Sequence, residues 1–94
     1  MEKYFDSIDD LASWAASNEI SVISIDAHKC LSVNGAVKYG LSCIARRPET
    51  ERPIRGQFNT NKFSDPSLID AEAEKIESKL RSHGFIVDRL TLPV

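Results

Sequence analysis

The sequence predicts an α+β fold: a two-layer sandwich in the order α-β-β-β-α-β, with both helices on one face of a mainly antiparallel four-stranded sheet. Two observations lead to this class. Two segments, residues 7–18 and 65–83, carry apolar side chains at helical spacing. Between them, residues 20–46 alternate apolar and polar side chains with a period of two. Because each of these elements has one apolar side, the layers bury those sides against each other and leave the second face of the sheet open.

Length and composition fit one domain over residues 1–94. The chain is 41% hydrophobic and 28% charged, as is ordinary for a globular protein, and its net charge of −2 gives no strong bulk attraction to nucleic acid or membranes. The N-terminus lacks the basic and apolar stretches of a secretion signal, and no apolar run approaches the roughly 18 residues of a membrane-spanning helix. We therefore expect a cytoplasmic protein without membrane contact, whose cysteines are thiols.

The first helix is predicted over residues 7–18. Ser7 is a favourable N-cap, and Asp10 stands three residues later, where an acidic side chain can complete a capping box. Asn18 is a plausible end. One apolar face results from the helical spacing of Ile8, Leu11, Trp14 and Ala15.

A hairpin is predicted from residue parity. From Ile23 to Val33 and from Val37 to Ala45 the apolar side chains are mostly odd-numbered and the polar ones even-numbered. Residues that lie opposite each other on two paired strands project from the same face of the sheet. The apolar side chains of both strands are odd-numbered, so they share one face only if the two residue numbers of each pair add up to an even number. A three-residue loop, Asn34–Ala36, meets this condition and pairs Val33 with Val37.

Parity also places single residues. Cys30 falls on the polar face and Cys43 on the apolar face, so a disulfide between them is not expected, and Cys43 should be a small core residue. Lys29 falls on the apolar face. Either it lies beyond the core with its ammonium group in water, or the strand bends there.

The remaining elements follow a charged loop over residues 46–53. Ile54–Phe58 predicts a shorter third strand with both end residues turned inward. The second helix starts at Asp65, an N-cap followed by proline at the first helical position, and Gly84 supplies a left-handed cap at its end. Phe85–Leu92 predicts a final strand at a sheet edge.

One set of potential metal ligands alternates along the first strand of the hairpin. Asp26, His28 and Cys30 should emerge on one face, and a cysteine beside a histidine can be a nucleophile. A zinc site usually needs four ligands, but Ser42 is expected opposite His28 and Gly40 opposite Cys30. We therefore expect no cofactor, metal or catalytic residue, and a metal-binding or thiol enzyme is the least favoured interpretation.

The middle of the chain is basic between two acidic ends. Residues 1–18 carry a net charge of −3, residues 19–63 of +3 and residues 64–94 of −2. The densest part is the segment 46–62, with Arg46, Arg47, Arg52 and Arg55. Such a cluster can bind phosphate backbones, or it can keep a sheet edge soluble, since Glu49 and Glu51 stand among the arginines.

The helix, three strands, helix order over residues 7–83 resembles the layout of double-stranded RNA-binding domains. In that family the second helix begins with lysines that meet phosphates across a groove. The matching stretch here, Ser64–Glu72, is acidic. The resemblance is limited to the order of elements and implies no shared RNA-binding surface.

These observations favour a small non-catalytic binding module, such as a regulator, inhibitor or accessory subunit that docks on another protein. The expected contact surface is the polar side of the hairpin, with Ser24, His28, Ser32 and Ser42. Nucleic-acid binding through Arg46, Arg47, Arg52 and Arg55 is the alternative, and a homo-oligomer formed through a sheet edge is a further one.

Overall fold

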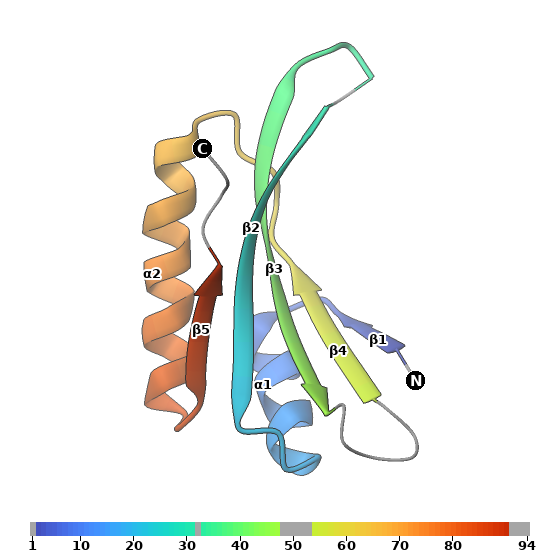
Figure 1. Ribbon diagram of the computed structural model, residues 1–94, viewed down its shortest axis with the longest axis vertical. Helices are drawn as coiled ribbons and strands as arrows, with labels where there is room; N and C mark the ends of the chain where they lie inside the picture. The colour runs from blue at the N-terminus through green and yellow to red at the C-terminus, as the bar shows by residue number, and fades with distance from the viewer. Residues whose placement is uncertain (1, 32, 48–53, 91–94) are drawn as a thin grey trace.

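The computed structural model describes residues 2–31, 33–47 and 54–90 (Figure 1). The described chain forms two helices and a five-stranded mixed sheet, which confirms the α+β class. Its elements in chain order are β1 (Glu2–Phe5), α1 (Ile8–Ser17), β2 (Val22–Leu31), β3 (Val37–Arg47), β4 (Ile54–Asn59), α2 (Pro66–Ser82) and β5 (Ile86–Leu90). No helix in this part of the chain is both long and apolar enough to cross a membrane.

The sheet has the strand order β1-β4-β3-β2-β5. The central pairs β2–β3 and β3–β4 are antiparallel, but β1 pairs with β4 and β5 pairs with β2 in parallel. The predicted four-stranded, mainly antiparallel sheet is therefore wrong in its strand number, because β1 adds a fifth strand, and the two outer strand pairs are parallel. The final strand β5 lies at an edge, as predicted. Each helix returns the chain to the end of the sheet where the preceding strand began, so the next strand runs in the same direction.

The β2–β3 hairpin keeps the predicted parity but not the predicted loop. Its register runs from Ile23 opposite Ala45 to Leu31 opposite Val37, so the expected pairing of Val33 with Val37 is wrong. In the turn the backbone N–H of Ala36 donates a hydrogen bond to Oδ1 of Asn34 at 3.1 Å. The asparagine side chain thus accepts a bond that a backbone carbonyl would accept in a regular turn.

The hairpin extends past the helices, as Figure 1 shows at its upper end. Lys29 lies opposite Tyr39 on β2 and is exposed. Its exposure agrees with the alternative in which its ammonium group stays in water. The exposed Leu31 and Val37 face each other at the tip.

Both predicted N-caps form. Oγ of Ser7 accepts the backbone N–H of Asp10 at 3.1 Å, and Oδ1 of Asp65 accepts that of Ser67 at 2.9 Å. These bonds satisfy N–H groups that have no partner inside the helix. Pro66 takes the first position of α2, as its missing N–H favours.

Both helices end in the same hydrogen-bonded turn. In α1 the backbone N–H of Ile20 donates to the carbonyl of Ala15 at 2.9 Å, and in α2 that of Phe85 donates to Leu80 at 3.1 Å. This turn places one residue in the left-handed conformation. In α2 that residue is Gly84, with φ 92°, as predicted.

The core lies between the helices and the odd-numbered side chains of β2 and β3. Both helices contribute to one cluster with these strands, so they cover the same face of the sheet. Its fully buried members are Leu11, Ile23, Ile25, Leu41, Cys43 and Leu80. Burial, followed by the charge of Glu72, raises the pKa of the Cys43 thiol to about 12. Cys30 is a free thiol on the opposite face.

Under β1 and β4 the core depends on one close approach. The ring of Trp14 packs against Phe5 with centroids 5.5 Å apart, and it lies directly over Gly56. A Cβ on Gly56 would come within 2.5 Å of Trp14 Cζ3, so this position requires a residue without a side chain.

Candidate functional site

The open face is the side of the sheet opposite α1 and α2. Even-numbered residues of β2 and β3 project from it, because their odd-numbered neighbours point into the core. The strand register defines a row of side chains that crosses all five strands on this face. In order from β5 to β1 the row is Asp88, Ser24, Ile44, Gln57 and Tyr4.

The structure places most of the predicted contact residues on this face. Ser24, His28 and Ser42 project from it, as does Arg46, which stands beside Arg55 in the β3–β4 register. Ser32 and Arg52 lie outside the described residues.

Arg47 takes the other side of β3. Its Nη1 donates to the backbone carbonyl of Asn18 at 3.1 Å, and its Nη2 lies 3.8 Å from a carboxylate oxygen of Glu19. Arg55 forms an ion pair with Glu2 at 2.7 Å. Arg46, Arg47 and Arg55 therefore do not form one basic patch.

A chain of hydrogen bonds crosses the open face near the middle of the hairpin. Nζ of Lys62 lies 2.7 Å from Nε2 of His28, and Nδ1 of the same ring lies 3.5 Å from Oγ of Ser42. The Ser42 hydroxyl donates to Oδ1 of Asn59 at 2.8 Å, and Nε2 of Gln57 donates to the same oxygen at 2.8 Å. Below, these five residues are called the His28 network.

The register corrects the expected neighbours of the potential metal ligands. The pairs found are His28 with Gly40, Asp26 with Ser42 and Cys30 with Lys38. Gly40 leaves space that the Lys62 side chain fills, since a Cβ there would lie 3.0 Å from Lys62 Nζ. In the described part of the chain no three metal-ligating side chains come together.

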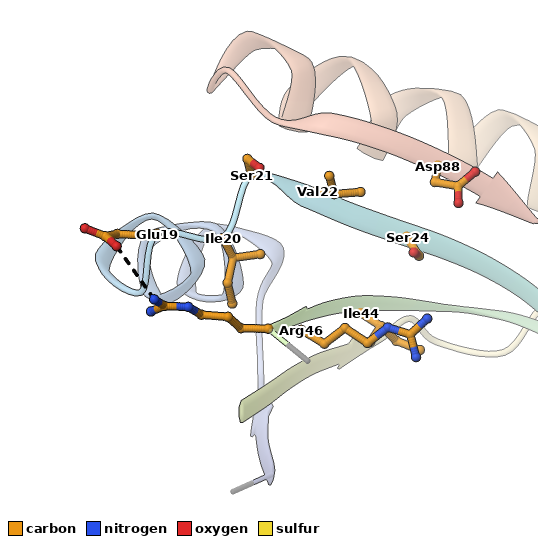
Figure 2. A pocket seen from close by; sticks show the side chains of 9 residues that line it. Glu19, Ile20, Ser21, Val22, Ser24, Ile44, Arg46 and Asp88 are labelled. Atoms are coloured by element: carbon orange, nitrogen blue, oxygen red, sulfur yellow. Dashed lines mark ion pairs between the residues drawn. The ribbon is translucent and has the colours of Figure 1, made fainter. Parts of the chain in front are cut away.

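A hollow of about 510 Å³ opens on this face, between the α1–β2 connection and the strands β2, β3 and β5 (Figure 2). It is called the Arg46 hollow below. Three of its residues are apolar (Ile20, Val22 and Ile44), and two serines stand among them. The full lining is Glu19, Ile20, Ser21, Val22, Ser24, Ile44, Arg46, Arg47 and Asp88.

The four charged side chains of the Arg46 hollow differ in their partners. Glu19 and Arg47 pair with each other, as the dashed line in Figure 2 shows. Arg46 extends alongside Ile44, away from that pair. Among the described residues neither Arg46 nor Asp88 has an ion pair or a side-chain hydrogen bond. As far as residues 2–31, 33–47 and 54–90 go, the hollow therefore presents one unpaired cation and one unpaired anion beside apolar side chains.

Glu19 forms part of the wall of this hollow in an uncommon backbone conformation. Its φ is 60°, and it is the one non-glycine residue with positive φ in the described ranges. It follows Asn18 at the end of α1 and takes the left-handed position that Gly84 takes at the end of α2. A residue with a Cβ is less stable in this conformation than glycine.

The sequence predictions included Ser24, Arg46 and Arg47 but missed Glu19, Asp88 and the hollow itself. A usable signal was present in Val22 and Ile44, which are apolar although their even numbers place them on the polar face. Asp88 had no such signal, because the parallel pairing of β5 with β2 brings it beside Ser24.

No family model, no curated protein and no solved structure matches this chain.

Proposed function

We propose that this protein is a small non-catalytic binding module, a regulator, inhibitor or accessory subunit, that docks on another protein through the open face. The observation that carries the proposal is the Arg46 hollow. Apolar side chains beside an unpaired arginine and an unpaired carboxylate are typical of protein contact surfaces, where apolar area supplies affinity and charge supplies specificity.

Exposed apolar residues on the open face support the same conclusion. Val22 and Ile86 are neighbours in the β2–β5 register and are 43% and 63% exposed. Tyr4, at the other end of the row across the sheet, is 63% exposed. Neighbouring exposed apolar side chains such as Val22 and Ile86 are typical of contact surfaces.

The chemistry of the reactive groups favours binding over catalysis. Both ring nitrogens of His28 face partners within its network, and they are therefore engaged within the protein. The Cys43 thiol is buried, and its pKa of about 12 keeps it from forming the nucleophilic thiolate at neutral pH.

Nucleic-acid binding is the second candidate, and the cations of the open face support it only in part. Among the described residues Arg46, Lys38 and Lys62 have no carboxylate partner, but Arg47 and Arg55 are paired with acids. A phosphate backbone would have to compete with those carboxylates, so the original cluster offers fewer phosphate contacts than its composition suggests.

The test is affinity capture from the native cell extract with three variants of equal charge change. Arg46→Glu alters the hollow, Lys62→Glu alters the His28 network, and Lys75→Glu alters an exposed position on α2. We expect a specific protein to be captured by the original chain and by Lys75→Glu, and to be lost with at least one open-face variant. Capture that does not differ among the three variants, or no specific capture at all, would refute docking through this face.

Nucleic-acid binding is measured in parallel by fluorescence anisotropy with single- and double-stranded DNA and RNA at low salt. Affinity that falls steeply with salt and is reduced by Arg46→Glu and Lys62→Glu would favour the second candidate. Undetectable binding at low salt would exclude it.

A further inference from the structure

We propose that the Arg46 hollow is a self-association site, at which two copies of this chain pack open face to open face about a twofold axis. Arg46 of each copy then pairs with Asp88 of the other. The inference shares with the proposed function only the premise that the open face is a contact surface.

The charges of the Arg46 hollow match those of a second copy of the same surface. Once Glu19 and Arg47 have neutralised each other, the hollow retains one cation, Arg46, and one anion, Asp88. In an interface about a twofold axis, the contact made by one residue with another is made twice, in reciprocal form. When two copies of this surface face each other, Arg46 of each copy can therefore pair with Asp88 of the other, and no charge is left without a partner of opposite sign.

Apolar side chains beside these charges would be buried when two copies associate. Val22 and Ile86 stand side by side on β2 and β5, and Ile44 lies next to Ser24 in the β2–β3 register. Their burial supplies the driving force, whereas the two reciprocal ion pairs fix the orientation of the copies.

The backbone of Glu19 bears on the same charge balance. Glycine would fit its left-handed position better, yet the glutamate there places a carboxylate oxygen 3.8 Å from Nη2 of Arg47. Without it the hollow would hold two cations and one anion, and two identical surfaces would then bring unmatched cations together. Glu19 thus keeps the hollow self-complementary.

The size of the site sets the expected strength. A stable interface buries about 800 Å² on each partner, which is about an eighth of the 6234 Å² surface of this chain. The hollow with Val22 and Ile86 covers one end of the open face, and the His28 network lies toward the other end. We therefore expect a weak dimer that leaves His28, Ser42 and Lys62 free for another partner.

Sedimentation equilibrium over about 1 µM to 1 mM protein tests the proposal, with circular dichroism as a check of folding. The original chain and the control Lys75→Glu should show the same monomer–dimer equilibrium. Arg46→Asp and Asp88→Arg should each weaken it by about tenfold or more, because each reversal opposes like charges twice.

Mixing the two charge variants gives the decisive result. The Arg46→Asp copy presents two acidic side chains and the Asp88→Arg copy two basic ones, so an equimolar mixture restores both ion pairs in a heterodimer. We expect the mixture to associate about as strongly as the original chain. A monomeric original chain, charge variants that dimerise unchanged, or a mixture no stronger than its components would each overturn the proposal. A monomer that still captures a protein through the open face would overturn self-association alone and leave the proposed function standing.

Discussion

The end of α1 places a glutamate where the backbone favours glycine, and the substitution Glu19→Gly measures what this costs. A residue with a Cβ loses about 1–2 kcal/mol in the left-handed conformation, which Glu19 adopts with φ 60°. Two smaller effects oppose the gain from glycine. The unfolded chain gains freedom worth about 0.4–1 kcal/mol. The lost ion pair with Arg47 is worth about 0–0.5 kcal/mol, because Glu19 is 83% exposed and the contact is 3.8 Å.

The net expectation is that Glu19→Gly raises the free energy of unfolding by about 0.5 kcal/mol, or the midpoint temperature by about 2–4 °C for a domain of this size. Urea and thermal unfolding followed by circular dichroism measure both quantities. Glu19→Ala is the control, because it removes the carboxylate and keeps the Cβ, so it should not stabilise. Gly84→Ala tests the reverse change at the end of α2 and should destabilise by about 1 kcal/mol. If Glu19→Gly proves no more stable than Glu19→Ala, the backbone argument is wrong.

Three further predictions concern packing and titration. Gly56→Ala should lower the free energy of unfolding by about 1–3 kcal/mol, because its Cβ would come within 2.5 Å of the Trp14 ring, and urea unfolding measures the loss. Gly40→Ala should lower it by less, about 0.5–1 kcal/mol in the same assay, since the new Cβ meets the movable Lys62 side chain at 3.0 Å and Nε2 of the His28 ring at 3.1 Å. Burial raises the pKa of Cys43 from 9.0 to about 12, so its contribution to stability is complete below pH 9 and is lost as the pH rises toward 12. The free energy of unfolding should therefore fall by about 1 kcal/mol per pH unit in that window, a slope that Cys43→Ala should reduce; equal slopes would contradict the assignment.

The parts of the fold that could be predicted are those fixed by a local rule. The caps at Ser7 and Asp65 follow from short side chains that accept backbone N–H groups, and Gly84 follows from its tolerance of positive φ. The faces of β2 and β3 follow from parity, because a one-residue slip would turn every apolar side chain outward. The loop could not be predicted in the same way. Pairing Val37 with Val33 or with Leu31 keeps the apolar side chains on the same face, so the pattern does not distinguish the two registers.

The parts that could not be predicted depend on partners distant in the sequence. β1 has four residues, of which only Phe5 is not exposed, so it has no apolar alternation and is a strand because its backbone pairs with β4. The parallel edges depend on where the two helices return the chain. The site shows the same division. Parity placed Ser24 on the open face, but only the pairing of β5 with β2 brings Asp88 beside it.

Glu19 allows stability and association to be separated in one variant. Glu19→Gly should make the fold more stable, yet it frees Arg47 and gives the Arg46 hollow two cations against one anion, so self-association should weaken by several-fold. Opposite changes in the two quantities, measured by urea unfolding and sedimentation on the same sample, would show that the glutamate serves the surface rather than the fold. If stability rises and association is unchanged, the pairing of Glu19 with Arg47 has no part in the contact. In that case Glu19 does not contribute to self-association. The reciprocal Arg46–Asp88 pairs are tested separately, by Arg46→Asp and Asp88→Arg.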